Sequence, residues 1–252
     1  MLSPSALELI RSIPKDGKII VLTGAGVSQE SGVATFRDSN GLWENHRIED
    51  VATPEAYQRN PQLVQDFYNK RRRLVVTVHP NKAHQALVHL EQKWKGDFLL
   101  VTQNVDDLHD RAGSKNLIHM HGELLKVQCT QCHHIWNHTK DVTLEERCIA
   151  CNTKGCVRPH IVWFGEIPLE MDRIEQALNG CDLFISIGTS GAVYPAAGFM
   201  HLARMAGAKT LELNLESTGR SNHFHECLYG PAGAAVPEVV NALLQDLSAS
   251  HS

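Results

Sequence analysis

The chain has 252 residues, of which 42% are hydrophobic and 21% are charged, and its formal net charge is −4. A chain of this length builds one large domain or a domain with an insertion. The negative charge argues against a nucleic-acid-binding protein, which needs a basic face, and no apolar run approaches the roughly 18 residues of a membrane span. The first residues lack the basic start and apolar core of a signal peptide, so we expect a cytoplasmic protein.

Strand-like and helical patterns alternate along the chain. Strands are expected at residues 19–23, 98–102, 117–120, 160–164, 183–188 and 210–214. Helices are expected at residues 4–12, 55–59, 62–78, 82–94, 171–179, 196–206 and 236–247. This alternation predicts an α/β fold with a Rossmann-like parallel sheet and helices on both of its faces.

Two stretches interrupt the alternation. Residues 44–78 are helical with no expected strand, and residues 124–156 are polar and rich in Cys and His. We expect these two insertions to form a small helical and zinc-ribbon domain. The Rossmann-like domain would then be discontinuous and consist of residues 1–43, 79–123 and 157–248.

The first expected strand ends in the loop Gly24-Ala25-Gly26. Glycines allow the backbone to turn sharply and to approach a ligand closely. A helix that began near Ser28 would point its free N–H groups at a phosphate above the loop. The dinucleotide fingerprint would place its third glycine at position 29, which is Gln29, so this is a modified nucleotide loop. A plain junction of strand, turn and helix is the alternative.

Four cysteines have the spacing of a metal site. Cys129-x-x-Cys132 and Cys148-x-x-Cys151 are separated by fifteen residues. Each Cys-x-x-Cys turn presents two thiolates to one metal, and two turns complete a tetrahedron. Because no coordination position is left for water or substrate, we predict one structural zinc ion. Redox pairs or free thiols are the alternatives, and Cys156 is close enough in sequence to compete as a ligand.

Several motifs, taken in order, resemble the sirtuin family of NAD-consuming lysine deacylases, and the resemblance covers roughly residues 15 to 245. The motifs are Gly24-Ala25-Gly26-x-Ser28 with Phe36-Arg37, Thr102–His109, His121-Gly122, the two Cys pairs, Pro159–Glu166, Gly188-Thr189-Ser190 and Asn214. The resemblance implies that NAD is consumed as a co-substrate. It also implies acyl-lysine segments of proteins as partners. From charge and composition we expect neither a nucleic-acid nor a membrane partner, and we favour a monomer.

The resemblance further implies which residues form the active site. His121 would be the general base and Asn104 the second catalytic residue. The acyl oxygen would attack the nicotinamide ribose, nicotinamide would leave, and His121 would activate a ribose hydroxyl before water releases lysine and O-acyl-ADP-ribose. The implied NAD site consists of Gly24, Ala25, Gly26, Ser28, Glu30, Phe36, Arg37, Trp43, Gln103, Asn104, Asp106, Gly188, Thr189, Ser190, Asn214, Glu216 and Ala232. From the residues alone, His119 competes with His121 as the base, and Asn104 and Asp106 could simply cap a helix.

Two segments resemble the edges between which a substrate backbone adds as a strand. The segments are 161–166 and 191–193, and their implied substrate contacts are Val162, Phe164, Gly165, Glu166 and Val193. Addition of a strand gives affinity through main-chain hydrogen bonds with little demand on sequence. The alternative is that Val162-Trp163-Phe164 is an ordinary core strand.

The helix expected at residues 62–78 carries a cation at the centre of an apolar face. At 100° per residue, Arg71 lies among apolar side chains with Tyr68 three residues before it, whereas Arg72 and Arg73 point away and should be solvated. A guanidinium that faces inward is costly unless an anion meets it. The Tyr-x-x-Arg pattern resembles the sirtuin subgroup that prefers succinyl, malonyl and glutaryl lysine, in which a small residue, here Ala56, widens the acyl pocket. A core salt bridge is the alternative.

Four other functions compete with an acidic-acyl deacylase. A hydride-transferring dehydrogenase would share the nucleotide loop but would not need the four cysteines or Arg71. A zinc-ribbon binding module would leave the Gln-Asn-x-Asp and His-Gly motifs unexplained. A protein ADP-ribosyltransferase would cleave the same bond of NAD and leave the label on protein. An enzyme that is mainly a deacetylase is the closest alternative.

Overall fold

The structure of the protein is a computed structural model, and residues 2–34, 42–43 and 46–248 are described. Phe36 and Arg37, two of the predicted NAD contacts, lie outside the described residues. Trp43 lies in the short strand β2 (Leu42–Trp43), which pairs with β3 (His46–Arg47).

Six parallel strands form the main sheet, in the order β11-β10-β9-β1-β4-β5. Their bounds are β1 (Ile19–Thr23), β4 (Phe98–Thr102), β5 (Leu117–His119), β9 (Leu183–Ile187), β10 (Lys209–Asn214) and β11 (Glu226–Tyr229). Every residue of β1, β4 and β9 is buried. A parallel sheet covered on both faces requires such continuous apolar strands.

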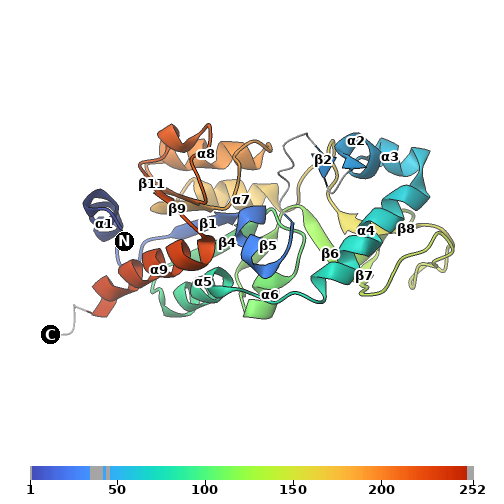
Figure 1. Cartoon of the computed structure of the whole chain (residues 1–252), viewed down its shortest axis with the longest axis horizontal. Helices are drawn as coiled ribbons and strands as arrows, with labels where there is room; N and C mark the ends of the chain where they lie inside the picture. The colour runs from blue at the N-terminus through green and yellow to red at the C-terminus, as the bar shows by residue number, and fades with distance from the viewer. Residues whose placement is uncertain (1, 35–41, 44–45, 249–252) are drawn as a thin grey trace.

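Helices cover both faces of this sheet, as Figure 1 shows. Ile19 and Val21 of β1 pack with α1 (Pro4–Arg11), α5 (Lys82–Lys93) and α9 (Ala232–Ser248), and Ile20 and Leu22 pack with α7 (Met171–Leu178) and α8 (Phe199–Met205). Successive strand side chains point to opposite faces, so each strand serves two cores. The predicted α/β fold is confirmed. None of the helices within the described residues is long and apolar enough to cross a membrane.

A second region lies at the other end of the molecule from the two chain termini (Figure 1). Its sheet is antiparallel, with the order β7-β6-β8, and contains β6 (Gly122–Cys129), β7 (Ile135–Asn137) and β8 (Val157–Ile161). The helices α2 (Ile48–Val51), α3 (Pro54–Arg59) and α4 (Pro61–Val75) precede it in the chain. Residues from both parts share one buried cluster that includes Val64, Phe67, Leu124 and Trp163.

Several sequence-based expectations were wrong in detail. The strand expected at 160–164 is β8 (Val157–Ile161), which pairs with β6 and not with the parallel sheet. The apolar run continues past the strand because Trp163 packs into the second core from an irregular segment. In place of a helix from Ser28, two single 3₁₀ turns occur at Ala25–Val27 and Gln29–Ser31. Strand β11, which lies at the sheet edge, was not expected.

Two neutral histidines are buried below the carboxyl end of the main sheet. The rings of His84, on α5, and His109, on α6 (Leu108–Ala112), lie 4.7 Å apart. The hydroxyl of Thr23 donates its only proton to Thr102 Oγ1. The contact of 3.0 Å between Thr23 Oγ1 and His109 Nε2 is therefore a hydrogen bond that His109 donates. Burial lowers the pKa of His84 to about 4 and lowers the pKa of His109 well below its ordinary value.

We therefore expect the free energy of unfolding to decrease in mild acid. Because both folded pKa values lie below the unfolded value near ~6.5, the stabilisation is present above that pH and is lost as the pH falls toward the folded values. Each histidine contributes at most about 1.4 kcal/mol per pH unit. Urea denaturation at pH 7, 6 and 5 measures the slope. His84→Gln should reduce the slope, and an equal slope in the two proteins would contradict the assignment.

Candidate active site

A cavity of about 710 Å³ opens where the main strands end, between the parallel sheet and the second region. Ligands of open α/β sheets bind at this carboxyl edge. Of the predicted NAD residues, the cavity is lined by Gly24, Ala25, Gly26, Glu30, Gln103, Asn104, Asp106, Gly188, Thr189, Ser190, Asn214, Glu216 and Ala232. Residues from four strand ends and from the start of α9 thus meet around one space.

The glycine loop is packed directly against the end of β9. Gly26 N donates to Gly188 O at 2.8 Å, and a Cβ at Gly26 would lie 2.7 Å from Gly188 Cα. No side chain fits between the two backbones, so the glycine is required by packing. On the cavity side, Glu30 Oε1 accepts a hydrogen bond from Gly233 N at 2.7 Å and ties the loop to the start of α9.

A buried hydrogen-bond network sets the orientation of Asn104 and Asp106. Ser28, which lies beneath the cavity wall, accepts a hydrogen bond from Asn104 Nδ2 and donates to Asp106 Oδ2, each at 3.0 Å. Asp106 Oδ1 also accepts a hydrogen bond from Leu108 N, the first residue of α6, as a capping role would require. Asp106 therefore contacts the helix and also lines the cavity. Burial raises the pKa of Asp106. Since its amide nitrogen is held by Ser28, Asn104 keeps its oxygen for a ligand.

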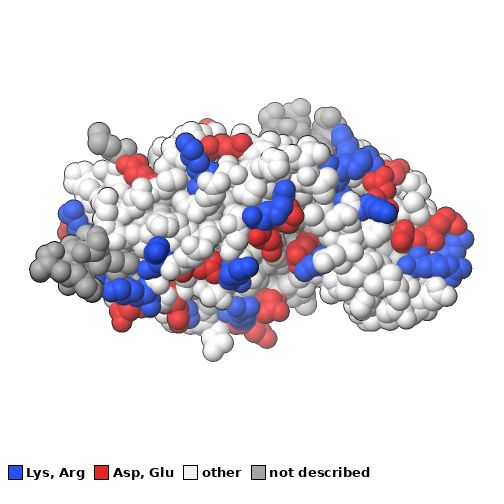
Figure 2. All heavy atoms as spheres, turned by 90° about the horizontal axis from the view of Figure 1, so that it is seen from below, with Lys and Arg blue, Asp and Glu red and all other residues white. Residues whose placement is uncertain are grey.

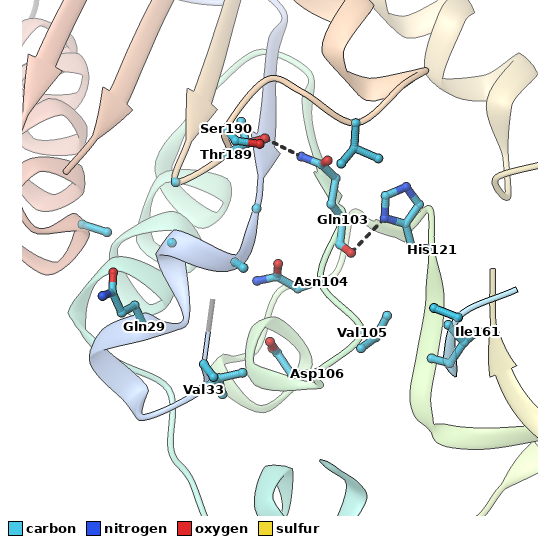
Figure 3. A pocket seen from close by; sticks show the side chains of 18 of the residues that line it. Gln29, Val33, Gln103, Asn104, Val105, Asp106, His121, Ile161, Thr189 and Ser190 are labelled. Atoms are coloured by element: carbon cyan, nitrogen blue, oxygen red, sulfur yellow. Dashed lines mark hydrogen bonds between the residues drawn. The ribbon is translucent and has the colours of Figure 1, made fainter. Parts of the chain in front are cut away.

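His121 lies at the junction of the two regions with its tautomer fixed. Its Nδ1 lies 3.1 Å from the backbone oxygen of Gln103, and a carbonyl can only accept, so Nδ1 carries the proton and Nε2 keeps a lone pair (Figure 3). Burial lowers the pKa of His121, with the Gln103 contact partly opposing it, so the ring is neutral at pH 7. The Gln103 side chain donates to Thr189 Oγ1 at 3.0 Å.

The residue after His121 explains the His-Gly motif. Gly122 has φ of 82°, and a Cβ there would lie 2.2 Å from His160 O. Any other residue would clash and force the ring of His121 to move.

The competing histidine, His119, is instead held by Asp110, 2.8 Å from its Nε2, and does not line the cavity. Burial lowers the pKa of His119, but the hydrogen bond and charge of Asp110 outweigh it and raise the pKa.

The segment from Val162 to Glu166 forms the opposite wall. Val162, Phe164, Gly165, Glu166 and Val193 all line the cavity. Sequence reasoning missed what holds this segment. Arg158 makes a two-point ion pair with Glu166, at 2.7 and 3.0 Å, and its guanidinium carbon lies 3.4 Å from the centre of the Trp163 ring. Burial alone would raise the pKa of Glu166, but the hydrogen bonds and charge of Arg158 lower it.

Tyr68 and Arg71 of α4 also line the cavity, and they are 0% and 7% exposed. The Tyr68 hydroxyl accepts a hydrogen bond from Trp163 Nε1 at 3.0 Å. Burial raises the pKa of Tyr68, with the Arg71 charge partly opposing it, so the phenol keeps its proton at pH 7. The predicted pocket residue Ala56 is fully buried in the adjacent core and does not line the cavity, whereas Ala52 does.

The four predicted zinc ligands gather at one end of the antiparallel sheet. All four sulfur atoms of Cys129, Cys132, Cys148 and Cys151 lie within 4.8 Å of one another. The Cys129–Cys151 and Cys132–Cys148 separations of 3.7 and 3.6 Å match the edge of about 3.8 Å that Zn–S bonds near ~2.3 Å give a tetrahedron. Cys156 lies beside Cys129, at 3.3 Å, with its thiol near Thr153 O. The donor set and its geometry fit a structural zinc ion.

Comparison with known proteins agrees with this geometry. The model of the Sir2 family matches residues 24–195. The NAD-dependent protein deacylase of Escherichia coli (strain K12) is 56% identical over 234 residues, which are 92% of this chain and 84% of the relative. The NAD-dependent protein deacylase SIR2rp3 of Leishmania major is 57% identical over 90% of this chain and 96% of its own. The chain belongs to the Sir2 family.

Solved structures of Sir2 proteins share the fold. A mutant Sir2 homologue in complex with ADP-ribose superposes with a TM-score of 0.89 at 36% identity over the whole of both chains. A Sir2 homologue–NAD complex gives 0.87 at 36% identity, over 98% of this chain and 96% of the other. Family and relatives together make this chain an NAD-dependent protein deacylase. The dehydrogenase and the inactive zinc-ribbon module are thereby set aside.

The zinc site generates a direct prediction. Purified protein should contain about one zinc ion per chain, and Cys148→Ser should lose the metal and unfold the second region, because a structural zinc contributes folding free energy. Metal analysis and thermal denaturation measure both effects. Cys156→Ser is the matched control and should retain zinc. A metal-free protein of native stability would contradict the assignment.

Proposed function

We propose that this deacylase removes acidic acyl groups, namely succinyl, malonyl and glutaryl, from lysine side chains, and removes acetyl groups less efficiently. The observation that carries the proposal is the guanidinium of Arg71, buried in the cavity wall beside the protonated hydroxyl of Tyr68. A substrate carboxylate at the end of the acyl chain could form an ion pair with this guanidinium. Acetyl-lysine has no such group.

The hydrogen bonding of Tyr68 supports the same assignment. Its oxygen accepts a hydrogen bond from Trp163 Nε1 at 3.0 Å, which holds the hydroxyl in the cavity wall close enough to Arg71 to feel its charge. A carboxylate that reached this part of the wall could contact both Tyr68 and Arg71. Hydrogen bonds to charged groups contribute about 1.5–3 kcal/mol each, which is enough to decide between acyl groups.

NAD would occupy the part of the cavity formed by the strand ends, where it supplies the nicotinamide leaving group and the ribose that accepts the acyl group. The Gly24–Gly26 loop lets the cofactor approach the backbone, and Asp106 and Asn104 face the space for the nicotinamide half. His121 Nε2, with its lone pair free, would accept the proton of a ribose hydroxyl. Asn214 and Glu216 would hold the adenosine ribose.

The protein substrate would enter as an extended segment between residues 162–166 and Val193. Its acyl-lysine would point past His121 toward Arg71.

On the face shown in Figure 2, basic and acidic side chains of the described residues are interspersed, as expected for a surface that does not bind nucleic acid. The Rossmann-like and small domains would meet at this cleft, and we propose a monomeric, cytoplasmic enzyme.

The role of His121 can be tested by substitution. His121→Tyr should lower kcat/KM by roughly 10²–10⁴-fold, because a general base is lost. Wild-type activity should also fall as the pH drops through the lowered pKa of His121, since only the neutral ring accepts a proton. Steady-state assays of nicotinamide release measure both effects. His119→Ala should be far milder, and the reverse ranking of the two variants would overturn the assignment.

The acyl preference can be tested with Arg71→Met and Tyr68→Phe. Leaving a partly desolvated carboxylate unpaired costs about 3–5 kcal/mol. At about 1.4 kcal/mol per tenfold, Arg71→Met should lower kcat/KM for a succinyl-lysine peptide by two orders of magnitude or more. Tyr68→Phe should cost less because it removes a neutral hydroxyl.

The matched substrate is the acetyl-lysine peptide of the same sequence. Its kcat/KM should fall much less in both variants, or rise. An equal loss on both peptides would mean that Arg71 is a structural ion-pair partner and that the enzyme is mainly a deacetylase.

Radiolabelled NAD distinguishes the remaining alternative, because an ADP-ribosyltransferase would leave the label on protein.

A further inference from the structure

Helix α4 carries a second set of buried polar residues, which do not line the cavity. Gln65, Asn69 and Arg72 are 0%, 5% and 0% exposed. Their spacing of four and three residues places them on one stripe of the helix. The sequence-based expectation that Arg72 is solvated was therefore wrong. Burial lowers the pKa of Arg72 to about 10, so the side chain is a buried cation that needs acceptors.

The stripe is bonded to the backbone of three separate segments around the zinc site. Gln65 Nε2 donates to Val157 O at 2.8 Å. The amide of Asn69 both donates to Val142 O and accepts from Val142 N, at 2.8 and 2.9 Å. Arg72 Nε donates to Leu124 O at 3.1 Å. Val142 and Val157 belong to the same buried cluster as the zinc ligands Cys129 and Cys148.

Within the stripe, Asn69 is the central residue. Arg72 Nη1 donates to Asn69 Oδ1 at 2.6 Å, so this one oxygen accepts from the helix and from the loop between the two Cys pairs. Without Asn69, the Arg72 guanidinium would keep only Leu124 O among the hydrogen bonds described here. The loop would also lose its two-point attachment to α4.

The two residues of α4 proposed to bind the acyl carboxylate are each directly followed by a residue of the stripe. Tyr68 precedes Asn69, and Arg71 precedes Arg72. Because neighbouring helix residues differ by about 100° around the axis, fixing the direction of Asn69 and Arg72 also fixes the direction of Tyr68 and Arg71. We propose that Gln65, Asn69 and Arg72 are positioning residues through which the zinc-bearing region sets the acyl pocket and hence the acyl selectivity.

This inference rests on the proposed acidic-acyl function, because it concerns where the carboxylate receptor is held. A misplacement of about 1 Å can lower turnover by about 10²-fold when the group concerned contacts the substrate. A succinyl group contacts the receptor and an acetyl group does not reach it. Loss of the stripe should therefore weaken the two substrates unequally, which a purely structural role would not do.

The test uses the whole zinc-loaded protein, NAD, and succinyl- and acetyl-lysine peptides of one sequence. Asn69→Ala and Arg72→Met should each lower the succinyl-to-acetyl ratio of kcat/KM by about tenfold, mainly by raising KM for the succinyl peptide. Arg72→Lys should restore part of the ratio. The matched control is Lys70→Met, because Lys70 is an exposed residue of the same helix, and its ratio should stay unchanged.

Zinc content and melting temperature are measured on every variant, so that a protein that fails to fold is recognised. In a Tyr68→Phe/Arg71→Met background, Asn69→Ala should cause no further change in the ratio, since both receptor groups that it positions are gone. An equal loss on both peptides in the variants would overturn the inference and leave the proposed function intact. A wild type with no preference for the succinyl peptide would overturn both.

Discussion

The carboxyl ends of the parallel strands all point to one edge of the sheet, and the rest of the active site depends on that geometry. Strands β1, β4, β9 and β10 each end in a loop that reaches the same cavity. Because the strands are buried on both faces, their ends are held rigidly by two cores. Loops carried on such a scaffold can place backbone N–H groups and polar side chains with little freedom to move. The glycine contact between Gly26 and Gly188 is possible only there.

The second region supplies what the sheet lacks, namely the walls that face the sheet edge. Its antiparallel sheet begins directly after His121, so β6 connects His121 at one end with Cys129 at the other. Helix α4 lines the cavity with Tyr68 and Arg71 and is hydrogen-bonded through Gln65 and Asn69 to residues of the cluster that contains Cys129 and Cys148. In the arrangement proposed above, the metal site would bear on substrate choice through these hydrogen bonds to the backbone.

Several buried polar groups at the cavity are matched to partners that fix their direction. Ser28 orients Asn104, the Gln103 carbonyl selects the tautomer of His121, and Trp163 donates a hydrogen bond to the Tyr68 hydroxyl. The first two contacts leave the Asn104 oxygen and His121 Nε2 as acceptors. A buried polar group without a partner is costly, so such networks specify a single arrangement more strongly than apolar packing does. The site is thus preorganised before a ligand arrives.

The sequence by itself determined the features that reside in short motifs. The apolar runs predicted the central strands, the two Cys-x-x-Cys turns predicted the sulfur cluster, and the resemblance at His121-Gly122 selected the histidine that lines the cavity. These signals are local, because a strand, a metal-binding turn or a glycine beside a functional group depends on neighbouring residues. The angular position of Arg71 also followed from helical periodicity.

Only the tertiary structure decided which distant segments meet. Periodicity showed that Arg72 points away from Arg71 but not that a second core lies on that side, so the residue was expected in solvent and is fully buried. The Arg158–Glu166 ion pair depends on the turn that follows β8, and the pairing of β8 with β6 depends on strands 28 or more residues apart in the chain. Such contacts are fixed by the packing of the whole chain, and a local sequence pattern carries no information about that packing.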